Sequence, residues 1–329
     1  MNKVLTFGEL LIRIQAASPE LIKKDEVAAV EVFAGGSEAN VAMALSYLNV
    51  PVAYCTAIPN NPITKSITTV LESSAVDVSK ILWQGSRIGT YYLLSANGLT
   101  SGDVVYDRAF SAFSALQPQD INWDALFLDC NWLHFTALTP ALSANMASLM
   151  LAVVQEASAR NMVISIDLNY RSKLWQYGSQ PIDVMPQLAK YCHVIMGNIW
   201  AANKMLGTTI DDTLNRHTTK EAYFEYATKV AGQIFSAFPN CRHVANTFRF
   251  IDNPKHNLFY GTYHTAGGNY ISDVLQTNEV VDRIGSGDAF MAGLICGIYN
   301  EYIPQHIIDT ATTTGFEKLF IKGDFINKM

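Results

Sequence analysis

The feature that most constrains the fold is a repeated alternation of apolar strands and helices that begins after Ser114. The predicted strands and the helices between them are, in chain order, Leu133–Thr136, 143–159, Val163–Asp167, 181–190, His193–Met196, 198–206, 222–238, His243–Thr247 and Leu258–Tyr263. Repeated units of this kind build a mostly parallel sheet between layers of helices. No repeat of about 20–50 residues and no low-complexity linker interrupts the chain. We therefore predict one α/β domain over residues 1–329.

Two segments near the N-terminus, about residues 9–33 and 86–113, have a different pattern. Apolar and polar residues alternate in parts of both, as at Leu11–Ile14 and 88–94. A period of two indicates short, half-exposed strands, and Gly98 lies where a hairpin would turn. Periodicity alone leaves open whether the two segments pair with each other.

Composition and charge exclude several classes of protein. The 329 residues carry a formal net charge of −6 without a lysine or arginine cluster, so we expect no nucleic-acid partner. No apolar run approaches the ~20 residues that span a bilayer, and the first strand is followed by polar sequence. This predicts a cytoplasmic protein without a membrane partner. The five cysteines lack C-x-x-C spacing and the seven histidines form no paired pattern, which predicts reduced thiols and no structural metal.

The segment Val281–Leu294 contains a strand end, a glycine-bearing turn and a buried helix. Gly285 and Gly287 flank Ser286, and a turn of this kind directs backbone N–H groups and the helix dipole at one point. An anionic phosphate is favoured there. Asp288 is unexpected beside such a site, unless it acts as a general base toward a hydroxyl group. The alternative interpretation is a helix cap with two turn glycines.

Two motifs together resemble the ribokinase/PfkB family of sugar kinases. Asp282–Asp288 resembles its Asp-x-x-Gly-x-Gly-Asp signature, and Phe33–Leu45 resembles its Gly-Gly-x-x-x-Asn motif. The two lie in the family's order, about 250 residues apart. The resemblance implies a ribokinase-like three-layer sandwich, in which the two alternating segments form a small β lid over the sugar and carry a homodimer contact. It also implies roles for particular residues: Asp288 as catalytic base, Gly285, Ser286 and Gly287 as anion hole, and Gly35, Gly36 and Asn40 as sugar contacts.

Two further strings resemble the 2-keto-3-deoxygluconate kinases of this family. Asp167–Arg171 has the pattern D-x-N-x-R at the end of a predicted buried strand, where open α/β sheets bind ligands. The resemblance implies that Asn169 and Arg171 contact nucleotide and substrate. The second string is Val105–Ala109 in the lid, and the resemblance implies that Tyr91, Tyr106 and Arg108 hold a sugar acid there. The alternatives are a solvated loop and a cross-strand aromatic pair with a surface charge.

The remaining site residues are also implied by the resemblance. Asn198, Asn246 and Arg249 correspond to the nucleotide side, and Asp324 to a further substrate contact, with a simple tail turn as its alternative. The chain departs from the family at Ala201, where many members have the glutamate of Asn-x-x-Glu. The P-loop pattern is absent, so the Gly285 turn is the candidate site for the phosphates of ATP, with Mg²⁺ entering on the nucleotide.

These features predict an ATP-dependent kinase that converts 2-keto-3-deoxygluconate to its 6-phosphate. An arginine in the lid favours a sugar acid, because a charged donor left unpaired beside a neutral sugar would cost binding energy. The alternatives are a fructokinase or another sugar kinase of the family, and a non-catalytic sugar-binding regulator. Retention of Gly285, Gly287 and Asp288 disfavours the regulator.

Overall fold

The central element of the computed structural model, which describes residues 2–16, 29–94 and 103–326, is a nine-stranded sheet. Its strands are β1 (Lys3–Phe7), β4 (Val52–Cys55), β9 (Cys130–Thr136), β10 (Val163–Asp167), β11 (Val194–Met196), β12 (His243–Phe250), β13 (Asn257–Thr265), β14 (Gly268–Ile271) and β15 (Leu275–Thr277). The order is β14-β13-β12-β11-β10-β9-β1-β4, and β15 also pairs with β13. The six strands from β4 to β12 are parallel, while β13, β14 and β15 are added as antiparallel pairs. The predicted mostly parallel sheet is confirmed.

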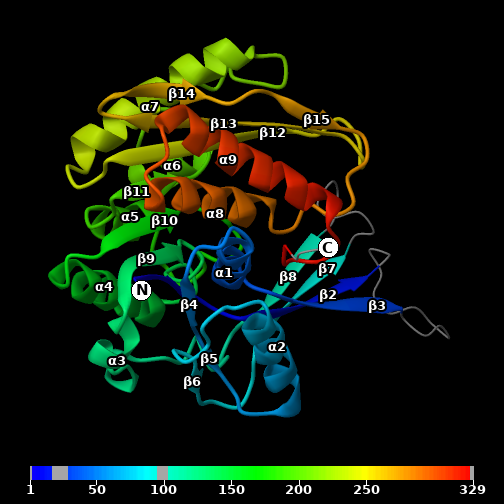
Figure 1. Ribbon diagram of the computed structural model, residues 1–329, viewed down its shortest axis with the longest axis vertical. Helices are drawn as coiled ribbons and strands as arrows, with labels where there is room; N and C mark the ends of the chain where they lie inside the picture. Colours follow the sequence, from blue (N-terminus) through cyan, green and yellow to red (C-terminus); the bar gives the residue numbers. More distant parts are fainter. Residues whose placement is uncertain (1, 17–28, 95–102, 327–329) are drawn as a thin grey trace.

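Helices cover both faces of this sheet, which gives the predicted three layers (Figure 1). One face is covered by α4 (Ala144–Ala159), α5 (Pro181–Ala189), α6 (Ile199–Leu206) and α7 (Lys220–Ala237), and the other by α1 (Ser37–Tyr47), α8 (Ser286–Tyr299) and α9 (Pro304–Glu317). Two separate apolar cores lie between the sheet and these two helical layers. The helices α2 (Pro62–Ser73) and α3 (Trp123–Phe127) and the short pair β5 (Ala57–Ile58) and β6 (Leu82–Trp83) lie beside the β4 end. All five cysteines are free thiols.

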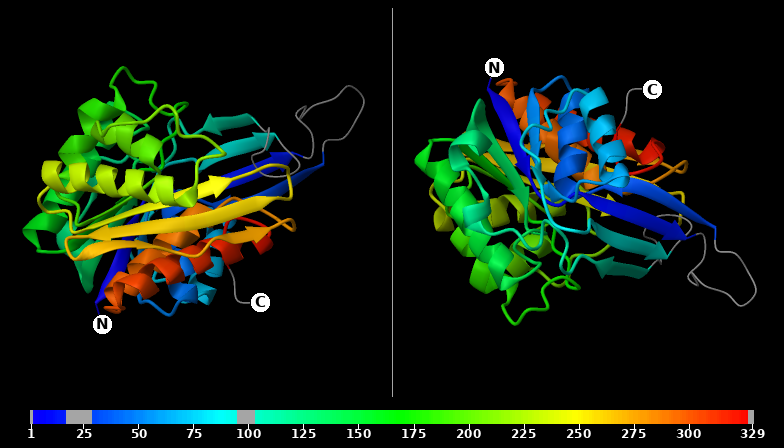
Figure 2. Two further views of the ribbon diagram at one scale, coloured as in Figure 1. Left: turned by 90° about the horizontal axis from the view of Figure 1, so that it is seen from above. Right: turned by 90° about the horizontal axis from the view of Figure 1, so that it is seen from below.

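A second sheet of four strands projects from one end of the molecule (Figure 2). Its order is β3 (Val30–Gly35), β2 (Leu11–Ala16), β7 (Gly89–Leu94) and β8 (Asp103–Asp107). Parallel pairing of β2 with β7 joins the two alternating segments of the sequence and places Arg13 opposite Tyr91. Residues 17–28 and 95–102 of the predicted lid lie outside the described part of the chain. That this sheet moves as a lid stays a prediction.

No helix among the described residues is long and apolar enough to cross a membrane.

Candidate active site

A cleft of about 350 Å³ lies between the four-stranded sheet and the carboxyl ends of β10 and β11. Most of the residues predicted from the sequence line it: Gly36, Asn40, Tyr91, Tyr106, Arg108, Asn169, Arg171, Asn198, Arg249, Gly285, Ser286, Gly287, Asp288 and Asp324. Gly35 and Asn246 are not part of the lining. The fold therefore brings residues from the whole length of the chain to one place.

Two helices begin at this cleft, and each is preceded by a glycine that the backbone requires. Gly36 precedes α1 with φ 120°, and Gly285 precedes α8 with φ 82°, values that side chains other than glycine rarely adopt. A Cβ on Gly36 would lie 2.2 Å from the carbonyl oxygen of Glu9, and one on Gly285 would lie 2.4 Å from that of Asp324. The first turns of two helices therefore lie at the same cleft, an arrangement that favours an anion, although the N–H of Ser286 already donates to the carbonyl of Arg283 at 3.3 Å.

Asp288 lies in the first turn of α8 and is 8% exposed. Its carboxylate accepts hydrogen bonds from Ser37 Oγ at 2.5 Å and Asn40 Nδ2 at 2.7 Å, both from the first turns of α1. Burial raises the pKa of Asp288, although these two donors and the charges of Arg171 and Lys318 oppose the rise. A buried carboxylate that is oriented from two sides and is more basic than usual is suited to accept a proton.

Two more carboxylates, Asp167 and Glu38, are buried, and the charges of Asp288 and Glu38 both act on Asp167. Burial raises the pKa of each to about 7, against hydrogen bonds that favour the charged form. Asp167 accepts from the N–H of Asn169 at 2.9 Å, and Glu38 accepts from the N–H and Oγ1 of Thr136 at 2.9 and 2.7 Å. Both therefore stabilise the backbone around the cleft, and neither was predicted as a site residue.

Arg108 has a protein partner that the sequence did not indicate. Its Nε donates to Glu9 Oε2 at 2.6 Å, and Ser111 Oγ donates to the other oxygen of Glu9 at 2.5 Å. The expectation that Arg108 would be left unpaired without a charged substrate is therefore wrong. The ion pair fixes the guanidinium in the cleft wall, because Arg108 is only 5% exposed.

Tyr91 and Asp324 belong to a buried ionic cluster centred on Arg13. Arg13 is fully buried, and contacts Asp282 Oδ2 through Nη2 at 2.8 Å and Asp324 Oδ1 through Nε at 2.9 Å. The hydroxyl of Tyr91 donates to Asp324 Oδ2 at 2.9 Å, and its ring lies 6.4 Å from that of Tyr106. Burial raises the pKa of Asp324 to about 6, while the charge of Arg13 lowers it. The cluster links the four-stranded sheet to the turn before α8.

The opposite wall of the cleft is basic. Arg249 Nη1 donates to Ser286 Oγ at 3.3 Å, and Arg171 is exposed and makes no hydrogen bond or ion pair with the described residues. Burial and the charges of Arg171 and Arg283 lower the pKa of Arg249 to about 10. Since its side chain also reaches solvent, the guanidinium stays charged at neutral pH. These cations suit the phosphates of a nucleotide.

The two asparagines predicted for the nucleotide have structural hydrogen bonds. Asn198 caps α6, accepting from the N–H of Ala201 at 2.8 Å while it lines the cleft. Asn246 is buried behind the cleft, where its Nδ2 donates to the carbonyl of Gly197 at 2.8 Å. Ala201 is also buried, in the apolar core beneath α6. Among the described residues, no group of three or more histidines, cysteines or acids could hold a metal ion.

Comparison with known proteins identifies the family. The model of the pfkB family carbohydrate kinases matches residues 1–233. The chain belongs to the pfkB family of carbohydrate kinases. The 2-dehydro-3-deoxygalactonokinase of Haloferax volcanii is 31% identical over 317 residues, covering 95% of this chain and 88% of that protein. The 2-dehydro-3-deoxygluconokinase of Bacillus subtilis is 26% identical over 323 residues, covering 97% and 90%.

The fold of this pfkB kinase is also found in solved structures. The 2-dehydro-3-deoxygluconokinase of Thermotoga maritima is 29% identical, with a TM-score of 0.87, and the match covers 100% of this chain and 97% of that one. The family model stops before the Gly285 turn, whereas these longer matches span nearly the whole chain. The chain is therefore a phosphotransferase of ribokinase-like fold that acts on a carbohydrate.

Several residues of the site were missed by sequence reasoning. Ser37 follows Gly36 directly, and Asp282 begins the Asp-x-x-Gly-x-Gly-Asp signature, so both were within the quoted motifs. Arg13 and Glu9 had no comparable signal, because their partners are distant in the sequence. Trp200 lines the cleft beside the predicted Asn198 and is 41% exposed. Its position next to that motif was the only sequence signal for it.

Proposed function

We propose that this kinase transfers the γ-phosphoryl group of ATP to the terminal hydroxyl of a 2-keto-3-deoxy sugar acid, with 2-keto-3-deoxygluconate as the leading candidate and its 6-phosphate as product. The observation that carries the proposal is the position of Arg108 and Arg171 in the lining of the cleft that contains Asp288. A planar carboxylate can accept charge-assisted hydrogen bonds from such groups. "2-Dehydro" in the names of two relatives denotes the same 2-keto group.

Asp288 is the general base in this proposal. It takes the proton of the substrate hydroxyl as the hydroxyl oxygen attacks the γ-phosphorus, the bond to the bridging oxygen breaks, and ADP leaves. Ser37 and Asn40 hold the carboxylate at the amino end of α8. The amides of Gly285–Gly287 and the dipole of α8 stabilise charge on the transferred group.

The phosphates of ATP lie in this proposal between the Gly285 turn and the basic wall. Arg249 contacts Ser286 of that turn directly. Magnesium enters with the nucleotide and is held by its phosphates and by water, its usual coordination in such sites. The buried position of Ala201 and the absence of an acidic triad among the described residues support this arrangement.

The four-stranded sheet closes over the sugar in this proposal and provides a homodimer contact on its outer side. Support comes from exposed apolar side chains beside each other on the sheet and on α2. Val32 is 62% exposed, Ile63 59% and Val70 45%, and all three line one shallow groove. Light scattering on the wild type and on Val32→Asp tests the contact, and a monomeric wild type would rule it out.

The substrate is tested by measuring ADP formation with 2-keto-3-deoxygluconate, its galacto epimer, fructose and ribose. We expect a sugar acid to exceed fructose in kcat/KM by ~10²-fold, the discrimination seen when polar groups of a site lose their partner. A higher value with fructose would replace the sugar-acid assignment by the fructokinase alternative. No activity on any sugar with any donor would favour the non-catalytic regulator.

A further inference from the structure

The wall behind the Gly285 turn contains a buried lysine that the mechanism above does not use. Lys318 is 1% exposed and belongs to the 3-10 turn Lys318–Phe320 that follows α9. Its Nζ donates to the carbonyl of Gly323 at 2.7 Å and to that of Ile321 at 3.0 Å. Burying a cation among backbone carbonyls costs free energy, because the ammonium group loses its hydration. A methionine would fill similar space without that cost.

The two carbonyl contacts place the C-terminal tail against the catalytic turn. The carbonyl oxygen of Asp324 and Cε of Lys318 would lie 2.4 and 3.3 Å from a Cβ on Gly285. The N–H of Gly323 donates to Asp282 Oδ2 at 3.1 Å, and the other oxygen of Asp282 accepts from the N–H of Ile284 at 3.0 Å. Lys318 therefore lies directly behind the turn and holds the segment on which the turn packs.

The charges in this wall balance only when Lys318 is protonated. Around the turn, Asp282, Asp324 and Asp288 provide three buried carboxylates, and Arg13, Arg283 and Lys318 provide three buried cations. Without the ammonium group, these buried groups would carry a net negative charge beside the turn. At an effective dielectric constant of about 20, charges at such short range interact strongly. The turn would then repel the phosphates that it is built to bind.

We propose that Lys318 is a positioning residue that acts as the internal counter-cation of the anion-binding turn. It holds the tail against Gly285 and keeps the wall behind the turn neutral, so that the amides of the turn can accept a phosphoryl group. The kinetic part of this inference rests on the proposed function, whereas its structural part concerns the turn itself.

The ammonium group also gives the turn a pH dependence. Burial lowers the pKa of Lys318 to about 8, although Asp282, Asp324 and Asp288 favour its charged form and Arg13 opposes it. Tyr91, which contacts Asp324, has a pKa raised well above its usual value by burial and stays neutral. Charge on Lys318 is thus complete below pH 7 and is lost as pH rises through about 8. We expect kcat/KM for ATP to fall over that range.

The kinetic test compares Lys318→Met and Lys318→Arg with wild type on the best sugar of the panel. Lys322→Met is the matched control, because that lysine is exposed and pairs with Glu31 at the surface. We expect the methionine variant to raise KM for ATP by at least ~10-fold with KM for the sugar nearly unchanged, because the phosphate side loses its counter-charge. The arginine variant should recover most of this loss and lack the fall near pH 8, because a guanidinium stays charged.

A second test uses Lys318→Ala with added methylammonium chloride, compared with tetramethylammonium chloride at equal ionic strength. Recovery with the small cation alone supports the inference. Unchanged KM for ATP in Lys318→Met, or a loss that neither arginine nor methylammonium recovers, would overturn it. If the variants do not fold, the wild-type pH profile decides, and a flat profile from pH 7 to 9 overturns the inference.

Hydrogen exchange of the ligand-free protein separates this inference from the proposed function. We expect faster exchange in Lys318→Ala at 285–288 and 321–324, and its reversal by methylammonium. If the wild type phosphorylates no sugar but these amides respond, only the proposed function fails. If the wild type is active but these amides exchange in Lys318→Ala at the same rate as in the wild type, the inference about Lys318 fails.

Discussion

Replacing Asp288 by asparagine should lower activity and raise stability in the same protein. The side chain keeps its size but can no longer accept a proton. Loss of a general base typically costs ~10²–10⁴-fold in rate, or about 3–5 kcal/mol of transition-state stabilisation. We expect that fall in kcat, with little change in the affinity for ATP, because the amides of the Gly285 turn remain.

The gain in stability follows from the direction of the pKa shift. Burial makes Asp288 harder to ionise in the folded protein than in the unfolded chain. Stability is therefore lost as pH rises from the unfolded pKa of 3.8 through the higher folded pKa, and the charge destabilises the fold above that range. Asparagine removes this effect. Its amide can still accept from Asn40 and donate to the hydroxyl oxygen of Ser37, so neither neighbour is left unpaired.

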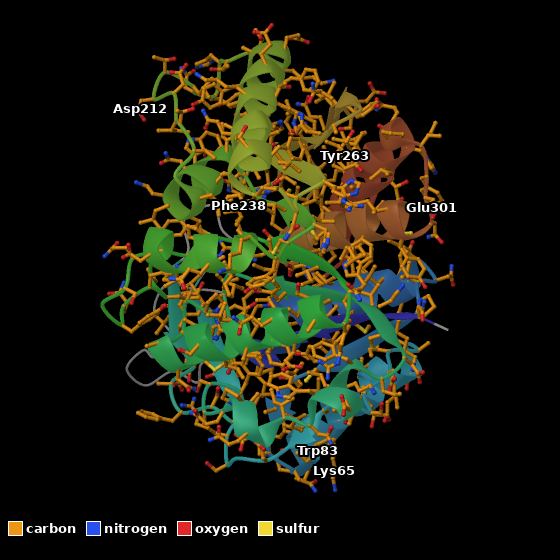
Figure 3. The ribbon with its side chains drawn as sticks, turned by 90° about the vertical axis from the view of Figure 1, so that its left-hand side faces the viewer. Lys65, Trp83, Asp212, Phe238, Tyr263 and Glu301 are labelled. Atoms are coloured by element: carbon orange, nitrogen blue, oxygen red, sulfur yellow. The ribbon has the colours of Figure 1, made fainter. Side chains whose placement is uncertain are left out.

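Two measurements on one preparation test this prediction. ADP release gives kcat, and thermal unfolding at pH 7.5 should show a higher Tm; in a chain of this size, each ~1 kcal/mol of stability raises Tm by ~1–3 °C. Asp212→Asn is the matched control, because it makes the same change in net charge at an exposed position between α6 and α7 (Figure 3) that does not line the cleft. Turnover near that of wild type would exclude Asp288 as the base. A lower Tm would show that its charge stabilises the fold.

Three further predictions address other parts of the site. Arg108→Ala should lower kcat/KM with both sugars, because it leaves the buried Glu9 carboxylate without its ion pair, and by a further ~10²-fold with the sugar acid, because only the acid offers a carboxylate; equal losses on both sugars would contradict this. Ala201→Glu should lower Tm rather than tighten magnesium binding, because the carboxylate would enter an apolar core; a lower half-saturating magnesium concentration would contradict it. Burial raises the pKa of Glu38 to about 7, so stability from this group declines between pH 4.5 and 7; Glu38→Gln should flatten the dependence of Tm on pH there, and an unchanged slope would refute the assignment.

The local parts of the site could be predicted from the sequence because their signals are local. A glycine turn followed by an apolar helix indicates an anion site, and φ 82° at Gly285 agrees with that interpretation. The alternation of apolar strands and helices similarly determined the parallel sheet. The two lid segments could be recognised as strands, but their pairing through β2 and β7 depended on a family resemblance. Hydrophobic periodicity reports which face of a strand is buried, and it does not name the neighbouring strand.

The ionic contacts behind the cleft could not be predicted, because nothing in the local sequence identifies a distant partner. Arg13 in β2 meets Asp282, 269 residues later, and Arg108 meets Glu9, 99 residues earlier. In the sequence each of these arginines follows or precedes apolar strand residues, a pattern equally typical of an exposed charge. The tertiary fold determines whether such an arginine is exposed or buried, and a buried arginine must be paired. The site is thus built in two layers. The inner layer of turns and helix starts can be read locally, and the outer layer of buried ion pairs, which holds the Gly285 turn and Arg108 in place, depends on the complete tertiary structure.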